Sequence, residues 1–454
     1  MCKEEESMKS SKKIIFLLIV LCAIIGIYIA KVSYDNKKQS EETDKIQLFK
    51  TDKKNIDAIE IKNNKGSFSI KNENNKFTVM NVRYKIDNTS VEEIVSNLCN
   101  IEALRLISDK KEDLSRFGLD NPQGQCTIYL KDGTSKKLYL GDVVPGGSAY
   151  YVAIGDNKIY TVSDTIGKQM IKSLDDIRDK TIVIANENIS GIKISNGNNI
   201  IELKSSDGTR WYMEQPYGMS VSADNDKLNS LIYSLKEIYI EGFVEDECKD
   251  LSKYGLNKPS LKVDVFEGNN TKSLIFGNKV GEDNIYFKTS DSNSIYMMSL
   301  ESFNTFNIKP FDIVSKCPVN PLIANIDEMT IVNGKNKYTF TVKKQNSGTN
   351  KNNDEVKYIY ELNGKQIKDE DFKDMYNKYC NLVVDSQIKN VIKGTPDVVI
   401  TFKLNEGFEK YVKIELIPYN DNFYEMLING KGDFAISKTQ INEFINLVKE
   451  KQKS

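Results

Sequence analysis

One decapeptide occurs twice in this chain, as DLSRFGLDNP over Asp113–Pro122 and as DLSKYGLNKP over Asp250–Pro259. The stretches around the two copies also match. LGD, which begins at Leu140, has its counterpart in FGN, which begins at Phe276. A hairpin-like stretch and an amphipathic helix precede each copy in the same order. A period of about 136 residues is the size of a domain, so the pattern predicts a duplicated domain rather than a solenoid of short repeats.

A third copy, degraded in sequence, is predicted to follow the second. DEDFKDMYNKYCNLVV has the pattern of the helix, and GTPDVVITFKLNEG has that of the strand after a lost decapeptide. Pro396 lies 137 positions beyond Pro259, which keeps the spacing of the first two copies. The predicted repeat units are residues 51–186, 187–322 and 323–454, preceded by a charged linker at residues 31–50.

Each repeat carries both helix and strand patterns. Leu228, Leu231 and Leu235 recur at helical spacing, so they would share one face of a helix. CTIYLKDGTSKKLYLG alternates apolar and polar residues around Asp132 and Gly133, which is a strong hairpin signal. The order of strand pair, helix, capped turn, antiparallel strands and second helix predicts an α+β fold, with repeated units of antiparallel β-sheet and covering helices.

The decapeptide pattern predicts the end of a helix followed by the start of a strand. Its aspartate is a good N-cap for one helical turn, which ends at the aromatic residue. The glycine then takes the left-handed C′ position, and the leucine after it can contact the leucine that follows the aspartate. The final proline prevents further helix and favours extended geometry before the next strand. This structural role, rather than a ligand site, is predicted for Asp113, Leu114, Phe117, Gly118, Leu119 and Pro122, and for Asp250, Leu251, Tyr254, Gly255, Leu256 and Pro259.

Composition excludes several classes of function. The chain has no histidine, so histidine triads, HExxH metal sites and histidine general bases are excluded, whereas chemistry by carboxylates or lysine stays open. The net charge is −1, which lacks the basic footprint that nucleic-acid binding requires. The seven cysteines form no CxxC motif and no close pair, so they indicate neither a zinc site nor a disulfide framework. We predict no catalytic, cofactor-binding or metal-binding residues.

An uncharged, mostly apolar stretch, Ile14–Ala30, stands between lysines near the amino terminus. A helix of that length spans roughly 25 Å, and flanking lysines that reach toward the surface let it cross a bilayer. A cleaved signal peptide is the alternative, but IYIAKVS is a poor cleavage site. We therefore predict a single-pass cell-membrane protein, with residues 1–13 in the cytoplasm, a transmembrane helix at residues 14–30 and the bulk of the chain outside the cytoplasm. The lysines around the span do not settle this orientation.

The decapeptide also carries a family resemblance. The pattern D-L-[SA]-x-[YF]-G-L-x-x-P, followed by LYLGD, YYV and IYTVS, resembles the bacterial family catalogued as domain of unknown function 4340. The second copy has the lead-in of Trp211 and Pro216 as well, which the first copy lacks. The resemblance covers about two thirds of the chain in two copies. It implies a membrane-anchored surface protein of unassigned activity that accompanies ABC-type export systems related to gliding motility.

The predicted function is a membrane-anchored, extracytoplasmic, non-enzymatic scaffold or accessory protein, associated with an ABC-type export or gliding-like system. Its expected partners are membrane lipid, through the amino-terminal helix, and a membrane protein of ABC type, but not nucleic acid. A cell-surface binding module for wall polymer or peptide is the alternative, and a carboxylate-based hydrolase ranks third. Fold-level analogy does not assign function. Retention of the purified chain by cell-wall material would favour the binding module.

Overall fold

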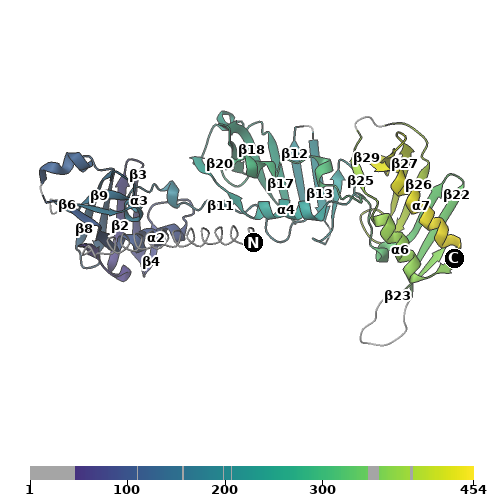
Figure 1. The fold of residues 1–454 in the computed structure, drawn as a ribbon, viewed down its shortest axis with the longest axis horizontal. Helices are drawn as coiled ribbons and strands as arrows, with labels where there is room; N and C mark the ends of the chain where they lie inside the picture. The colour runs from purple at the N-terminus through teal and green to yellow at the C-terminus, as the bar shows by residue number, and fades with distance from the viewer. Residues whose placement is uncertain are drawn as a thin grey trace, which may run out of the picture. The chain divides into compact units, whose positions relative to one another are not determined.

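The chain divides into two compact units, Met1–Asp179 and Lys180–Ser454, which we call the amino-terminal and carboxy-terminal units (Figure 1). The computed structural model describes residues 46–109, 111–155, 158–197, 199–205, 207–345, 357–388 and 392–453, with the backbone alone described at residues 111–113. Each unit is described separately below.

The amino-terminal unit contains one large antiparallel sheet, the first sheet. Its strands are β2 (Ile56–Asn63), β3 (Gly66–Glu73), β4 (Lys76–Val79), β6 (Arg105–Ser108), β7 (Gly124–Leu130), β8 (Ser135–Val143), β9 (Ala149–Ala153) and β10 (Ile159–Ser163). They lie in the order β4-β3-β2-β7-β8-β9-β10-β6. Two helices pack together and against this sheet, α2 (Asn88–Leu98) and α3 (Asp164–Met170). A separate pair is formed by β1 (Ile46–Lys50) and β5 (Asn100–Ala103), and the short turns are η1 (Lys53–Asn55), η2 (Lys111–Phe117) and η3 (Asp175–Ile177).

The carboxy-terminal unit begins with the second sheet. Its strands are β12 (Gly191–Asn196), β13 (Asn199–Ser205), β14 (Trp211–Gln215), β16 (Gly242–Glu245), β17 (Leu261–Glu267), β18 (Asn270–Val280), β19 (Asn284–Thr289) and β20 (Ile295–Ser299). Their order is β14-β13-β12-β17-β18-β19-β20-β16. The other elements are the pair β11 (Thr181–Ile182) and β15 (Ile238–Tyr239), helices α4 (Asn225–Lys236) and α5 (Leu300–Asn304), and turns η4 (Leu251–Tyr254) and η5 (Pro310–Ile313).

The third sheet completes the carboxy-terminal unit. Its strands are β21 (Ile326–Asn333), β22 (Asn336–Gln345), β23 (Lys357–Leu362), β24 (Lys365–Ile367), β25 (Val384–Gln387), β26 (Val398–Leu404), β27 (Tyr411–Pro418), β28 (Phe423–Ile428) and β29 (Lys431–Ser437). They follow the order β24-β23-β22-β21-β26-β27-β28-β29-β25. Turn η6 (Ile323–Asn325) precedes this sheet, and helices α6 (Asp369–Cys380) and α7 (Lys438–Lys453) cover one of its faces (Figure 1).

The three sheets share one strand order, which confirms the internal repeat predicted from the sequence. In each, the first long strand pairs with its hairpin partner on one side and with the strand after the decapeptide region on the other, as β2, β12 and β21 show. In each sheet, a short strand that follows the first helix (β6, β16 or β25) lies at the far edge, beside the last strand of the sheet (β10, β20 or β29). The third sheet differs by one additional edge strand, β24. The exact boundaries proposed for the repeat units stay a prediction.

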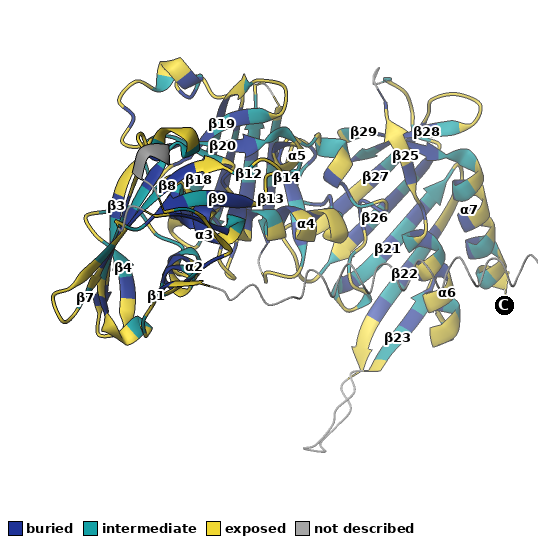
Figure 2. Ribbon diagram, turned by 60° about the vertical axis from the view of Figure 1, so that its left-hand side comes forward, coloured by how far each residue is buried: buried dark blue, intermediate teal, exposed yellow. Residues whose placement is uncertain are grey.

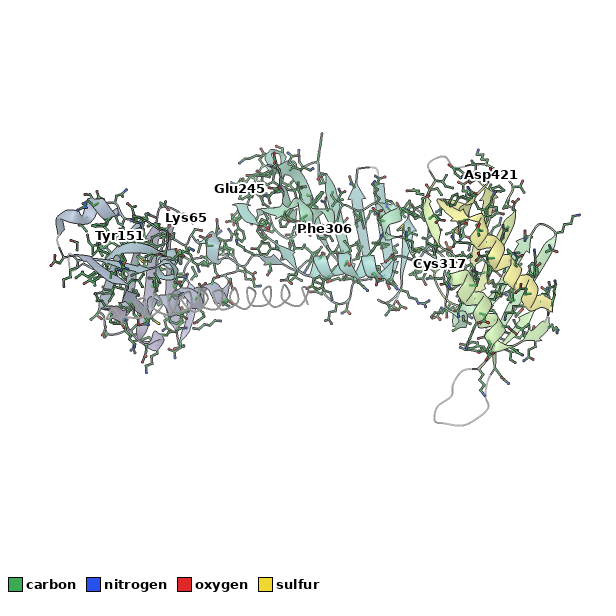
Figure 3. The ribbon with its side chains drawn as sticks, in the orientation of Figure 1. Lys65, Tyr151, Glu245, Phe306, Cys317 and Asp421 are labelled. Carbon is green, nitrogen blue, oxygen red and sulfur yellow. The ribbon has the colours of Figure 1, made fainter. Side chains whose placement is uncertain are left out.

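Alternation of apolar and polar residues places one face of each sheet in the core (Figure 2). In β2, Ile59 and Ile61 are fully buried on one face, whereas Lys62, on the opposite face, is exposed to solvent. The buried face packs on the apolar stripe of α2, which includes Ile94 and Leu98. The second sheet repeats the arrangement, with Phe306 in its core (Figure 3). We call the helix-covered faces the inner faces.

The predicted α+β class is wrong. Strands account for 46% of the described residues and helices for 22%, so the fold is mainly antiparallel β. The helices gave strong periodic signals in the sequence, but each large sheet is accompanied by two helices, of which α7 has 16 residues and α5 only 5. Eight or nine strands per sheet therefore outweigh them.

The predicted membrane topology and localisation also lose their support. Within residues 46–453, as far as the structure describes them, no helix is both long enough and apolar enough to cross a bilayer. The stretch Ile14–Ala30, on which the single-pass prediction depended, lies outside the described residues, as does the amino-terminal stretch 1–13.

Candidate functional site

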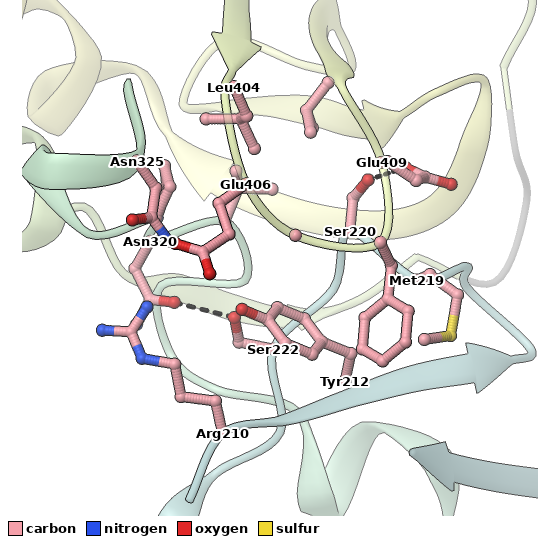
Figure 4. Close-up of a pocket in the computed structure, with 15 residues that line it drawn as sticks. Arg210, Tyr212, Met219, Ser220, Ser222, Asn320, Asn325, Leu404, Glu406 and Glu409 are labelled. Atoms are coloured by element: carbon pink, nitrogen blue, oxygen red, sulfur yellow. Dashed lines mark hydrogen bonds between the residues drawn. The ribbon is translucent and has the colours of Figure 1, made fainter. Parts of the chain in front are cut away.

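A pocket opens in the carboxy-terminal unit where the second and third sheets meet. The empty space among its lining residues, including the part open to solvent, is about 440 Å³. The start of β14 contributes one wall, the β26–β27 loop contributes the opposite wall, and the segment that connects the two sheets contributes the floor. Residues that matter for its chemistry are Arg210, Tyr212, Asn320, Glu406, Phe408 and Glu409 (Figure 4). We call it the junction pocket.

Arg210 is positioned by a tight turn just before β14. The carboxylate of Asp207 accepts hydrogen bonds from the backbone N–H groups of Thr209 and Arg210, both at 2.9 Å. The N–H of Arg210 and then that of Thr209 hold the pKa of Asp207 at about 2, although burial opposes them. The carboxylate of Asp207 is therefore ionised near neutral pH and holds the turn in place. The guanidinium group of Arg210 forms no hydrogen bond or ion pair with any residue that the structure describes, so it is available to a ligand.

A network of side chains fastens the second sheet to the third beside the pocket. The hydroxyl of Ser220 donates to Glu409, and the amide of Asn429 donates to Glu409 at 2.6 Å and to Ser220 at 3.2 Å. Nearer the floor, the hydroxyl of Ser222 donates to the side-chain oxygen of Asn320 at 2.7 Å (Figure 4). These bonds join residues far apart in the sequence, so the walls of the pocket are held in fixed positions.

The connecting segment is in turn fixed to α6. The hydroxyl of Tyr379 donates to the carbonyl of Val319 at 2.7 Å, and that of Tyr376 donates to the carbonyl of Pro321. Cys317 lies in the same segment (Figure 3), and burial raises the pKa of its thiol to about 12. A thiol with so high a pKa is a packing group rather than a nucleophile.

Aromatic rings form the apolar part of the junction pocket. The rings of Tyr212 and Phe408 meet edge to face with centroids 5.5 Å apart. Phe408 is 44% exposed although it is a large apolar residue, and the buried Val412 also lines the pocket. The pocket thus brings together a guanidinium group, two carboxylates and an aromatic wall, an arrangement that suits the recognition of a small amphipathic ligand.

The decapeptides lie elsewhere, on the outer faces of the first two sheets, opposite the inner faces. In the first, Tyr139 and Tyr151 alternate with inner-face residues and pack with decapeptide side chains; Tyr151 is labelled in Figure 3. The ring centroids of Phe117 and Tyr151 are 4.6 Å apart, and those of Tyr254 and Tyr286 in the second sheet are 4.8 Å apart. We call these groups the outer clusters; their decapeptide members are Leu114, Phe117 and Leu119, and Leu251, Tyr254 and Leu256.

The decapeptide backbone has Schellman geometry in both copies. Gly118 and Gly255 have φ of +68° and +72°. The N–H of Leu119 donates to the carbonyl of Leu114 at 2.9 Å, and that of Leu256 donates to Leu251 at 3.0 Å. Pro122 and Pro259 follow and precede β7 and β17.

The capping aspartates are described in one copy. Asp250 caps η4, because its carboxylate accepts from the N–H of Ser252 at 3.0 Å and from its hydroxyl at 2.5 Å. This gives the decapeptide serine a role that sequence reasoning left open. The side chain of Asp113 lies outside the described residues.

Sequence reasoning missed the strand glycine that receives each decapeptide. A Cβ at Gly141 would lie 2.1 Å from the carbonyl oxygen of Phe117, and one at Gly277 would lie 2.1 Å from that of Tyr254. The signal was present, because LGD and FGN recur with the decapeptide. The junction pocket was missed altogether, since its residues come from different repeats and share no motif.

The third sheet departs from this pattern at its outer face. Strand pairing places Glu425 opposite Ile417, where the first two sheets have the outer-cluster tyrosine and the strand glycine. Glu425 is fully buried; one carboxylate oxygen accepts from the N–H of Ile392 at 3.0 Å, and the other has no hydrogen-bond partner among the described residues. Burial raises the pKa of Glu425, and the nearby charge of Asp433 adds to this effect.

Metal-binding clusters are absent from the described part of the chain: it contains no group of three or more Cys, Asp or Glu residues that could hold a metal ion. The cysteines at positions 99, 126, 248, 317 and 380 are all free thiols.

The fold and the junction pocket define a class of protein: antiparallel sheets of the same strand order follow one another along the chain, and the second and third of them share a pocket where they meet. The family described as Domain of unknown function (DUF4340) matches residues 77–221 and residues 211–384, and the chain belongs to this family. The two matches agree with the resemblance carried by the decapeptides. No curated protein and no solved structure matches the chain.

Proposed function

We propose that this protein is a non-enzymatic scaffold or accessory protein whose repeated sheets hold a partner protein. The observation that carries the proposal is the shared core of the second and third sheets. Buried residues from Ile184 to Val448 form one continuous apolar cluster, and side-chain bonds fasten the two sheets at the junction pocket. A fixed surface composed of two repeats supports a role in holding a partner. The partner we propose is a protein of an ABC-type export system, which the family resemblance suggests.

Crosslinking in the host cell tests this proposal. A tagged full-length chain is crosslinked, purified and analysed by mass spectrometry, with an unrelated tagged β-sheet protein of similar size as the control. We expect one partner in near-stoichiometric amount that is absent from the control. Recovery of the chain alone would count against the scaffold role, and recovery of a partner outside ABC-type systems would change the partner but leave the scaffold in place.

A second candidate is a binding module for wall polymer or peptide, and the junction pocket favours it. The pocket offers an aromatic wall and an unengaged guanidinium group, neither of which a passive scaffold requires. Retention of the purified chain on cell-wall material, with Tyr212→Ala as the pocket variant, tests this candidate. We expect the wild-type chain to be retained and the variant to be released; equal behaviour of both would remove the pocket from the binding surface.

A further inference from the structure

We propose that the junction pocket binds a free α-amino acid with an apolar side chain. The inference rests on the second candidate function, ligand binding at the pocket, and names the chemical class of the ligand. It is drawn from three features of the pocket: its unengaged charges of opposite sign, its aromatic wall and its fixed frame.

Two opposite charges are free to contact a ligand. The guanidinium of Arg210 and the carboxylate of Glu406 both line the pocket, and neither forms a hydrogen bond or an ion pair with a residue that the structure describes. In Figure 4 the two groups lie toward the same side of the pocket. Glu409 is different, because Ser220 and Asn429 already occupy one of its oxygens.

An α-amino acid carries a carboxylate and an ammonium on a single carbon, so it presents both charges close together. Its carboxylate can form paired hydrogen bonds with the planar guanidinium of Arg210, while its ammonium faces Glu406. A ligand with only a carboxylate would place that group beside the negative charge of Glu406. A ligand with only an ammonium would face the positive charge of Arg210. Both single-charge ligands are therefore disfavoured relative to the zwitterion.

The remainder of the pocket selects the side chain of the ligand. The rings of Tyr212 and Phe408, with the aliphatic side chains of Leu404 and Val412, form its apolar lining. Burial of an aliphatic side chain against this lining contributes roughly 25 cal/mol per Å². The polar ends of the ligand would face Arg210 and Glu406.

The frame of the pocket is set before any ligand arrives. The Asp207 turn fixes Arg210, and the Ser220, Glu409 and Asn429 network fixes the loop that carries Glu406. Preformed walls lower the entropic cost of binding. Ligand contacts from both walls would also strengthen the attachment of the second sheet to the third.

The single tryptophan of the chain reports on this pocket without any labelling. Trp211 is buried and lies between Arg210 and Tyr212 in the sequence, and its carbonyl accepts from the N–H of Ala223 at 2.9 Å. The experiment titrates the full-length chain with L-leucine, with leucinamide, which lacks the carboxylate, and with N-acetyl-leucine, which lacks the ammonium. Fluorescence of Trp211 and isothermal titration calorimetry are measured on the same solutions.

We expect saturable binding of L-leucine and at least about ten-fold weaker binding of both derivatives, since each loses a charge-assisted contact. Arg210→Gln should remove the difference between leucine and leucinamide. Glu406→Gln should remove the difference between leucine and N-acetyl-leucine. Arg116→Gln, in turn η2 of the amino-terminal unit, is the control and should bind like the wild type.

Other outcomes separate this inference from the function on which it rests. Equal binding of all three compounds, or an equal effect of Arg116→Gln and Arg210→Gln, would overturn the zwitterion while leaving the pocket a binding site. Absence of binding in both measurements would overturn the inference, and the wall-retention assay then decides independently whether the binding-module function falls with it.

Discussion

At the scale of single residues, Gly277 fixes how closely the decapeptide approaches its sheet. A methyl group there would lie 2.1 Å from the backbone carbonyl oxygen of Tyr254, which cannot rotate away as a side chain would. We expect Gly277→Ala to destabilise the carboxy-terminal unit by about 1–3 kcal/mol, since a well-packed site has to shift to admit the added atom. Urea unfolding followed by the fluorescence of Trp211 measures this cost.

Gly268 supplies the control for this substitution. Unlike Gly277, it has a positive φ, of +58°, and an added Cβ would meet no atom within 4 Å. Gly268→Ala therefore isolates the backbone strain, about 1–2 kcal/mol at most. A Gly277→Ala variant as stable as the wild type would show that close approach of the decapeptide is not the reason for the glycine.

The buried carboxyl of Glu425 makes stability depend on pH. Burial, with Asp433 nearby, raises its pKa above the ordinary value of 4.5. The folded protein then holds the proton more tightly than the unfolded chain, so the stabilising contribution is complete below pH 4.5 and is lost as the pH rises through the folded-state pKa. We expect Glu425→Gln to flatten this decline and to raise stability at neutral pH by about 1–3 kcal/mol.

Urea unfolding at acidic and mildly alkaline pH, again followed by Trp211, checks this expectation. Glu443→Gln is the control, because the side chain of Glu443 is 57% exposed and pairs with Lys378 at the surface. A Glu425→Gln variant as pH-dependent as the wild type would show that the carboxyl is not a source of the effect.

Local chain rules go far at this scale, but only where the partner is nearby in the sequence. The left-handed Gly118 and Gly255 follow from the residues on either side of them. The same rules are silent about Gly277 and Glu425, because the atoms that make these positions special come from other strands. Arg210 and Glu406 are the extreme case, since only the packing of two sheets brings them to one pocket.

At the scale of elements, the two decapeptides have the same backbone role, but their aromatic residues are buried to different extents. Tyr254 is buried, packs on Tyr286 and donates its hydroxyl to Glu245 at 2.6 Å, whereas Phe117 is only half-buried against Tyr151. We expect Tyr254→Ala to cost about 3–5 kcal/mol and Phe117→Ala about half as much. Scanning calorimetry of the full-length variants measures both, and a larger loss for Phe117→Ala would contradict the assigned packing.

Strand order survives in the third sheet although its decapeptide is lost, and the reason lies in the inner faces. Leu416 and Met426 keep the inner-face positions of Phe276 and Phe287, while the outer face changes freely to Ile417 and Glu425. The period and the apolar alternation therefore sufficed to predict the repeat. They did not suffice for the fold class, because helical periodicity stands out in a sequence more than strands that bury alternate residues do.

At the scale of the whole molecule, the described apolar cores follow the two compact units. The amino-terminal unit has its own inner core, whereas one continuous core runs through the second and third sheets of the carboxy-terminal unit. Tyr217 and Phe434 illustrate the continuity, because the ring of Tyr217, which follows β14, packs at a tilt against that of Phe434 in β29, with centroids 4.7 Å apart. A shared core of this kind leaves neither sheet a separate stable state.

We therefore expect the second and third sheets to unfold in one cooperative transition. In the full-length chain, Trp211 fluorescence reports the second sheet, and hydrogen exchange of peptides from β26 reports the third. Both signals should be lost at the same urea concentration, since exposing either inner face uncovers the apolar surface of the other sheet. Glu409→Ala should lower this common midpoint, because Ser220 and Asn429 lose their acceptor, yet keep the two signals together. Exchange of β26 at a clearly lower urea concentration than the change in Trp211 would show that the third sheet opens by itself, and that the junction is a hinge between two domains rather than the interior of one.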